Sequence, residues 1–86
     1  MKEEKIGAVT HYFSKAGAAT LKLTDGDLKV GDEIRIKGHT SDFKQVVESI
    51  QIEHQSVAEA KMGSDIGLKV KERVHEHDVV YKIISD

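Results

Sequence analysis

The sequence predicts an all-β domain, specifically a single small closed antiparallel β-barrel of about six strands. Two observations predict it. Apolar and polar residues alternate with a period of two in several short runs, which is typical of strands with one buried face. Turn-forming Gly, Asp and Ser residues separate these runs at regular spacing, without long helical segments or an internal repeat. We favour a barrel over an open sheet because closure protects strand edges from pairing with other chains.

Two strands are expected before the centre of the chain. Ile6–Phe13 is rich in β-forming residues and ends at a turn through Gly17. Ala18–Thr24 then returns as the second strand, and a turn at Asp25-Gly26 follows. Alternation in the second strand places the apolar residues Ala19, Leu21 and Leu23 on the same face.

The central stretch, Leu28–Gln55, is the segment around which we expect the barrel to be organised. Glu33–Lys37 alternates charged and apolar residues, and Val46–His54 carries apolar residues on even positions. The segment Gly38–Asp42 between them is polar and rich in turn-forming residues. We therefore predict that the two runs pair as a hairpin with a medium-length loop.

Two further strands are expected after this hairpin. Ser56–Gly63 is too short for a stable helix, so we predict a structured loop whose Val57 and Ala60 plug the barrel. Ile66–Val70 is again one-sided, and Val79–Ile84 is a β-branched run suited to closing the barrel against the first strand.

Length and composition limit the class of protein. The 86 residues are expected to form one domain over 1–86, with 1–4 as a flexible terminus. Thirteen basic and 15 acidic residues give 13 − 15 = −2, which argues against gripping nucleic acid by bulk charge. Cysteine is absent, and no signal peptide or membrane span is recognised, so a cytoplasmic protein without membrane contact is expected.

Several motifs together resemble the β-barrel second domain of translational GTPases such as elongation factor Tu. The most specific are Val30–Ile34 (VGDEI), similar to a "vGDe(v/i)xi" strand, and Gly63–Leu68 (GSDIGL), similar to "AGDnvGL". The resemblance extends from about Lys5 to Ile84 and includes stand-alone elongation-factor-like proteins and the β-barrel tails of some collagenase-like peptidases. It implies a translation-protein type of barrel and a role in translation.

The chain also departs from that family. It lacks a phosphate-binding loop, so no nucleotide is expected to bind this chain alone. The glutamate and arginine that help the family hold aminoacylated transfer RNA correspond here to Gln51 and His54, which removes a charged acceptor and a forked donor. His77 stands where related proteins usually turn with glycine, so strain or a different loop is expected there.

Basic residues supply the candidate binding surface. Arg35 and Lys37 share the wet face of one predicted strand, Lys69 and Lys71 that of another, and Arg73 lies beyond. Acidic residues interrupt both stripes, so cross-strand charge pairs that serve only solubility are the alternative interpretation. Phe43 is an aromatic residue in a polar segment. It is a candidate for base stacking or partner docking, or alternatively for packing over a barrel end.

No catalytic or metal site is predicted, and no cofactor. His75 and His77 would face the same side of an extended strand and could ligate a metal, but a third ligand is not evident, which favours a solvated loop. Ser41 and Asp42 lie near His39 in sequence, yet the members of a catalytic triad converge from separated elements.

The sequence therefore predicts a non-catalytic β-barrel binding module. The leading hypothesis is a translation-associated protein that contacts tRNA, rRNA, the ribosome or a translation factor through the basic faces. The alternative is a protein–protein interaction adaptor related to peptidase-associated barrels, which would use Phe43 and the loop from His39 to Asp42.

Overall fold

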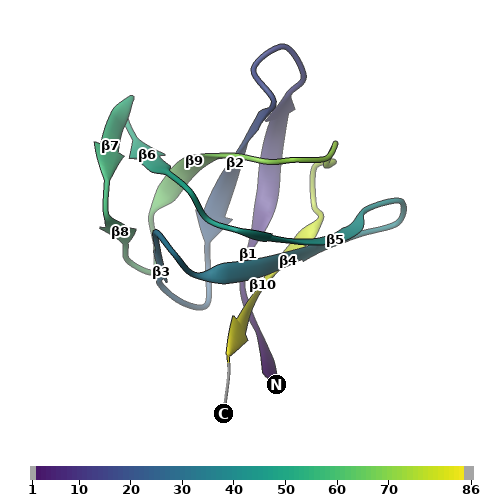
Figure 1. The fold of residues 1–86 in the computed structure, drawn as a ribbon, viewed down its shortest axis with the longest axis horizontal. Helices are drawn as coiled ribbons and strands as arrows, with labels where there is room; N and C mark the ends of the chain where they lie inside the picture. Colours follow the sequence, from purple (N-terminus) through teal and green to yellow (C-terminus); the bar gives the residue numbers. More distant parts are fainter. Residues whose placement is uncertain (1, 85–86) are drawn as a thin grey trace.

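The structure is a computed structural model that describes residues 2–84, and the regular elements in this part of the chain are all β-strands (Figure 1). The predicted all-β class is confirmed. The described residues include no helix long and apolar enough to cross a membrane. Ten strands follow one another along the chain: β1 (Lys2–Phe13), β2 (Ala18–Leu23), β3 (Leu28–Lys29), β4 (Glu33–Lys37), β5 (Asp42–Val46), β6 (Ile50–Ile52), β7 (Gln55–Val57), β8 (Glu59–Ala60), β9 (Asp65–Lys69) and β10 (Val79–Ile84).

Eight of these strands form one antiparallel sheet in the order β5-β4-β10-β1-β2-β9-β6-β7, and β3 pairs with β8 in a small second sheet. The long strand β1 is central, with β10 on one side and β2 on the other. Its register shifts between Lys5 and Gly7 against β10, and between Val9 and His11 against β2. Such bulges bend and twist a strand, which helps the sheet to curl around its core.

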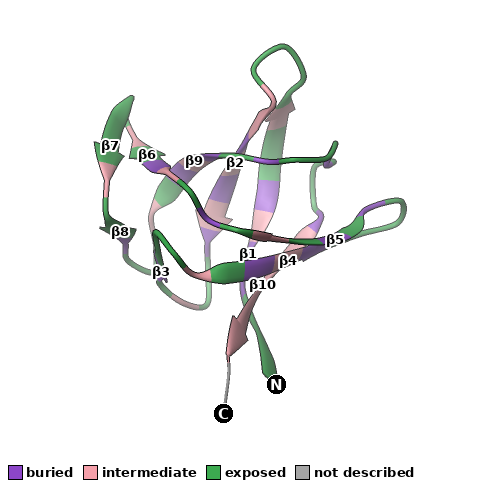
Figure 2. Ribbon diagram, viewed as in Figure 1, coloured by how far each residue is buried: buried purple, intermediate pink, exposed green. Residues whose placement is uncertain are grey.

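The core lies on the inward face of the curled sheet, as the buried residues of β1, β2, β4 and β9 show (Figure 2). The alternation predicted for the second and fifth strands is confirmed, because one set of residues is buried: Ala19, Leu21, Leu23, Ile66, Leu68 and Val70. Ala60 is also buried, and Val57 packs against the core, so both fill the interior as predicted. They do so from the short strands β7 and β8 rather than from a loop.

The prediction of a closed barrel of about six strands was wrong in strand number and in closure. The main sheet has eight strands, and its end strands β5 and β7 do not pair with each other. The physical reason is that residues 42–52 form one bent stretch, which pairs with β4 at its start and with β9 at its end. The chain itself therefore crosses from the β4 side of the sheet to the β9 side, in place of a continuous hydrogen-bonded ladder.

The prediction of one strand over Val46–His54 was also wrong. The strand that forms a hairpin with β4 is β5, with Ile36 opposite Phe43, and the connecting loop is correspondingly shorter. Val47 is buried, and its N–H and C=O bond the backbone of Asp32 and Gly31 just before β4, so Val47 faces the core in place of the exposed Val46. Of the rest of the predicted strand, Ile50–Ile52 form β6, and Glu53 and His54 form the turn that leads into β7.

A side chain spans the gap between β5 and the segment that follows β9. Gln45 donates from Nε2 to the carbonyl oxygen of Lys69 at 2.7 Å, and its Oε1 accepts from the backbone N–H of Lys71 at 2.9 Å. The amide thus satisfies one acceptor and one donor that a neighbouring strand would otherwise satisfy. We call this contact the Gln45 seam.

The N-terminal residues take part in the sheet. Residues 1–4 were predicted to be a flexible terminus; residue 1 lies outside the described residues, and Lys2 already pairs with Ile84 at the start of β1. The first strand therefore begins earlier than the predicted Ile6. The last strand, β10, has the predicted bounds.

Candidate functional site

The outward face of β9 is unusual because a glycine separates two opposite charges. Ile66 and Leu68 point inward and are buried, so Asp65, Gly67 and Lys69 share the outer face. Gly67 pairs with Thr20 of β2 on one side and with Gln51 of β6 on the other. The missing side chain at Gly67 leaves a hollow in the middle of three adjacent strands.

One wall of this hollow comes from β1 and β2. Phe13 lies opposite Ala18 and keeps 47% of its surface exposed, although it is a large apolar side chain. The ring of His11 meets the ring of Phe13 edge-to-face, with 4.5 Å between the centroids. The hydroxyl of Thr20 is held by a 2.7 Å hydrogen bond with the hydroxyl of Thr10. The side chains of Phe13 and Thr20 are therefore both held in place by contacts with residues of β1.

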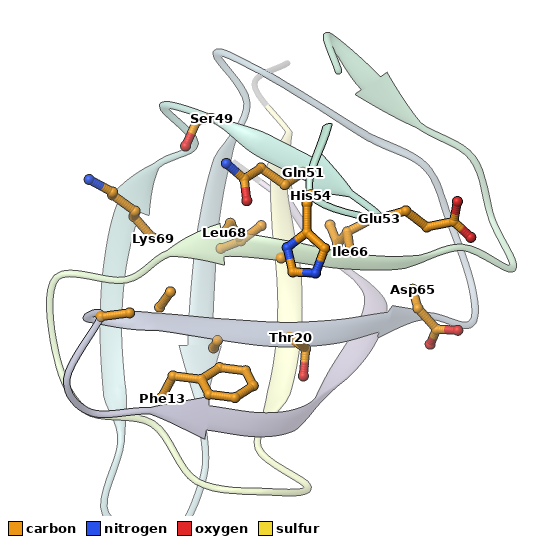
Figure 3. Close-up of a pocket in the computed structure, with 14 residues that line it drawn as sticks. Phe13, Thr20, Ser49, Gln51, Glu53, His54, Asp65, Ile66, Leu68 and Lys69 are labelled. Atoms are coloured by element: carbon orange, nitrogen blue, oxygen red, sulfur yellow. The ribbon is translucent and has the colours of Figure 1, made fainter. Parts of the chain in front are cut away.

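The opposite wall comes from β6 and the turn that leads into β7. Gln51 projects from β6 toward the hollow, and Glu53 and His54 form the turn (Figure 3). Both turn residues have positive φ, 50° for Glu53 and 66° for His54. This tight two-residue turn places a carboxylate and an imidazole at the rim.

Together these residues enclose a groove of about 560 Å³, within the range typical of ligand pockets. Figure 3 shows Lys69 and Ser49 at one end and Asp65 and Glu53 at the other, with Phe13 across from Gln51. We call this hollow the β9 groove. Its lining residues are Phe13, Ala16, Ala18, Ala19, Thr20, Ser49, Gln51, Glu53, His54, Asp65, Ile66, Gly67, Leu68 and Lys69.

The fold itself does not require a glycine at the floor of the β9 groove. A Cβ built on Gly67 would have its nearest neighbour, the carbonyl oxygen of Ala19, at 4.0 Å, which is ordinary van der Waals contact. Glycine inside a strand is unfavourable and often marks a place where a ligand or another backbone approaches closely. Gly67 is the feature that makes this surface a candidate binding site.

The predicted basic residues do not form one uniform surface. Arg35 is held by Asp42, with Nε to Oδ1 at 2.7 Å, and by Glu3, with Nη1 to Oε2 at 3.0 Å. These hydrogen bonds, Asp42 first, raise the pKa of Arg35, and the bond from Arg35 lowers the pKa of the Asp42 carboxyl. Lys37 is exposed on the same strand. Arg35 therefore makes the kind of charge pairs that the alternative interpretation expected.

The second basic stripe lies on the other side of the Gln45 seam. Lys69 and Lys71 are exposed next to β5, and Lys69 also lines the β9 groove. The guanidinium carbon of Arg73 lies 5.9 Å from the centroid of the Tyr12 ring, a cation–π distance. The three residues thus have different neighbours.

Phe43 does not occupy an exposed loop. It lies in β5 opposite Ile36 and is only 7% exposed, within the hydrophobic core. The Phe43 ring therefore packs in the core and is not placed for base stacking or partner docking. The exposed aromatic residue is Phe13, which the sequence placed in the first strand without a role.

The histidine cluster near β10 forms a turn instead of an extended strand. The N–H of His75 donates to Oδ2 of the buried Asp78 at 3.0 Å, and the N–H of Asp78 donates to the carbonyl of His75 at 3.1 Å. His77 has a φ of 74°, so the predicted local strain is present. Among residues 2–84, no three His, Asp or Glu side chains converge closely enough to hold a metal ion.

Sequence reasoning missed the β9 groove, although two signals pointed to it. Gly67 interrupts an otherwise regular strand, and the outward positions of that strand alternate acid, glycine and base. The positions matched to the RNA-contacting motif, Gln51 and His54, do line the groove. Their convergence with Phe13 depends on a strand order that the sequence pattern does not give.

Comparison with known proteins points to peptidases. No family model matches the chain. A collagenase of Porphyromonas gingivalis is 40% identical over 78 residues, which are 90% of this chain and 22% of the collagenase. An uncharacterized protease of Methanocaldococcus jannaschii is 41% identical over 78 residues, 90% of this chain and 19% of the protease. The chain thus spans about a fifth of the length of these curated relatives.

A solved structure gives the same indication. The C-terminal domain of a putative U32 peptidase from Geobacillus thermoleovorans superposes with a TM-score of 0.87 at 26% identity, covering 94% of this chain and 93% of that domain. The resemblance to collagenase-like peptidases is confirmed, whereas these relatives give no support to the elongation-factor resemblance. The chain is similar to a domain that occurs in collagenase and U32 peptidase proteins.

Proposed function

We propose that this chain is a non-catalytic module that binds an extended polypeptide in the β9 groove, in association with a collagenase- or U32-type peptidase. Its similarity to about a fifth of a collagenase supports a role as one part of such a protein. The match to nearly all of a U32 peptidase C-terminal domain supports the same role. This proposal follows the adaptor hypothesis, with the site moved from Phe43 and the loop after His39 to the groove.

The observation that carries the proposal is the unfilled floor at Gly67. A strand in which a Cβ would fit without overlap gains stability from a β-branched side chain, so keeping glycine there is a local cost. The same groove is lined by Phe13, a large exposed apolar ring. An apolar groove with a few polar groups at its rim suits a peptide side chain.

The charges of the groove favour a peptide over nucleic acid. One lysine, Lys69, lines it, together with the two carboxylates Glu53 and Asp65. Phosphate backbones are bound through several Lys or Arg contacts, and carboxylates repel them. The translation hypothesis required such contacts along the basic stripes, where Arg35 is already paired with Asp42 and Glu3.

Selection from a random peptide library displayed on phage tests the proposal. Immobilised wild-type protein is expected to enrich a peptide consensus, and Gly67→Val is expected to lose it because the new side chain occupies the floor of the groove. Glu33→Val is the control, since it adds the same side chain at an exposed position of β4, away from the groove. Its enrichment should match the wild type.

A titration with total tRNA at increasing salt serves as the competing measurement. Peptide enrichment that survives in Gly67→Val would contradict the proposal. So would an absence of enriched peptides together with tRNA binding that weakens steeply with salt, since that dependence indicates phosphate contacts.

A further inference from the structure

We propose that the β9 groove selects a peptide strand carrying an acidic, a bulky apolar and a basic side chain at alternate positions. The inference rests on the proposed function and adds the chemistry of the ligand. It follows from three properties of the groove: opposite charges at its two ends, an apolar centre, and a length that matches a short strand.

The two ends of the groove carry charges of opposite sign. Lys69 stands at one end, whereas Asp65 and Glu53 stand at the other (Figure 3). Lys22 lies 3.6 Å from Asp65 and offsets one of the two carboxylates. Because both partners of that ion pair are substantially exposed, it is weak. One end therefore attracts a carboxylate and the other a cation.

The centre of the groove is apolar and open. Phe13 forms one wall, and Ala18 and Gly67 leave the groove open because their side chains are small or absent. An aromatic or large aliphatic side chain would pack against the Phe13 ring, where offset or edge-to-face aromatic contacts are favourable. Gln51 on the opposite wall offers an amide to the backbone of the same peptide.

The spacing of these features matches a β-strand. Asp65 and Lys69 are four residues apart in β9, which corresponds to about 13 Å of extended chain. A peptide strand lying along β9 places its side chains i, i+2 and i+4 on one face over the same length. Three alternate side chains can therefore meet the basic end, the centre and the acidic end together.

Synthetic peptides with blocked ends test the pattern directly. The probe is acetyl-Ser-Glu-Ser-Phe-Ser-Lys-Ser-amide, and its affinity is measured by fluorescence anisotropy or calorimetry at low salt. Replacing its Phe by Ser should weaken binding the most, by about tenfold or more, because it removes the buried apolar contact. Replacing its Glu or its Lys by Ser should weaken binding by about two- to fivefold each, as expected for exposed charge pairs.

A charge reversal in the protein provides the decisive comparison. Lys69→Glu should prefer a probe whose Glu is replaced by Lys, whereas the wild type should prefer the original probe. Lys29→Glu is the matched control, because Lys29 is exposed on β3 outside the groove lining and carries the same charge change. It should keep the wild-type preference.

The outcomes separate this inference from the proposed function. Peptides that bind in a manner abolished by Gly67→Val, but whose affinity ignores the charge reversal at Lys69, would overturn the charge pattern and leave the peptide-binding function standing. An unchanged affinity of the original probe for Gly67→Val would place its binding outside the groove and overturn both.

Discussion

Gly7 and Gly67 both lie inside strands of the same sheet, yet the structure explains only one of them. Gly7 is buried in β1, and a Cβ there would overlap the carbonyl oxygen of Lys22. A Cβ on Gly67 would meet only the carbonyl oxygen of Ala19 at 4.0 Å. Close approach of two strands requires the first glycine, whereas the second leaves open a surface that the fold could have filled.

Two other residues that are unusual for their positions resemble Gly7, because the structure shows why each is present. Gln45 lies on the same face of β5 as the buried Phe43, and its amide bonds the backbone of Lys69 and Lys71. His77 adopts a left-handed backbone, and its N–H donates to the carbonyl of Val9 at 2.8 Å. Where an unusual residue in a strand has a visible structural partner, we infer that it stabilises the fold. Where it has none, as at Gly67, we infer a role in function.

The largest effect is expected at Gly7. Gly7→Ala should lower the free energy of unfolding by about 2 to 4 kcal/mol, because the methyl group must push β1 and β2 apart. Chemical denaturation followed by circular dichroism measures this loss. A change below about 0.5 kcal/mol would show that the strands separate easily and would weaken the contrast with Gly67.

The next effect is expected at the Gln45 seam. Gln45→Leu keeps the size of the side chain but leaves a carbonyl of Lys69 and an N–H of Lys71 to water, so a loss of about 0.5 to 1.5 kcal/mol is expected. Gln51→Leu, on the outer face of β6, is the control and should be nearly neutral. Equal losses in the two variants would mean that the seam contributes little.

A smaller effect of opposite sign is expected at His77. Because glycine adopts positive φ without steric cost, His77→Gly should stabilise the protein by about 0.5 to 1 kcal/mol. His75→Gly, where the backbone φ is not positive, should instead destabilise it. Thermal unfolding of both variants separates the backbone effect from the loss of an imidazole.

The smallest effect is expected at Asp42, and it depends on pH. Its pKa is lowered in the folded protein by Arg35, so the pair stabilises the fold above the unfolded-state pKa of about 3.8 and loses this contribution as pH falls through the folded-state value. Asp42→Asn should therefore be less stable than wild type near pH 7 and converge with it in acid. A difference that does not shrink as the pH falls would contradict an origin in ionisation.

The sequence was sufficient for much of the fold. Clean alternation predicted β2 and β9 to within one residue, and β4 and β10 have the bounds expected from their patterns. It failed at β5, where Lys44 and Gln45 interrupt the apolar alternation around Phe43. It also failed between Val46 and His54, because Val47 and not Val46 faces the core, and because the chain then pairs with β9, a tertiary contact that a local pattern does not record.

The candidate site was less predictable than the fold. Lys69 was identified as an exposed basic residue, which the structure confirms, but its partners in the groove come from four strands. Phe13 looked like an ordinary strand residue, and its neighbour in the sheet is Ala18, whose small side chain leaves the ring exposed. Strand order, which places β9 between β2 and β6, is set by the packing of the whole sheet.

One variant, Gly67→Val, tests the central claim most directly when its unfolding and its peptide binding are measured on the same preparation. We predict a free energy of unfolding equal to the wild type or higher by about 0.5 to 1 kcal/mol, since a β-branched residue replaces glycine in a strand. We predict that the same protein no longer binds the peptides selected by the wild type. A variant as unstable as Gly7→Ala, or one that still binds those peptides, would contradict the account.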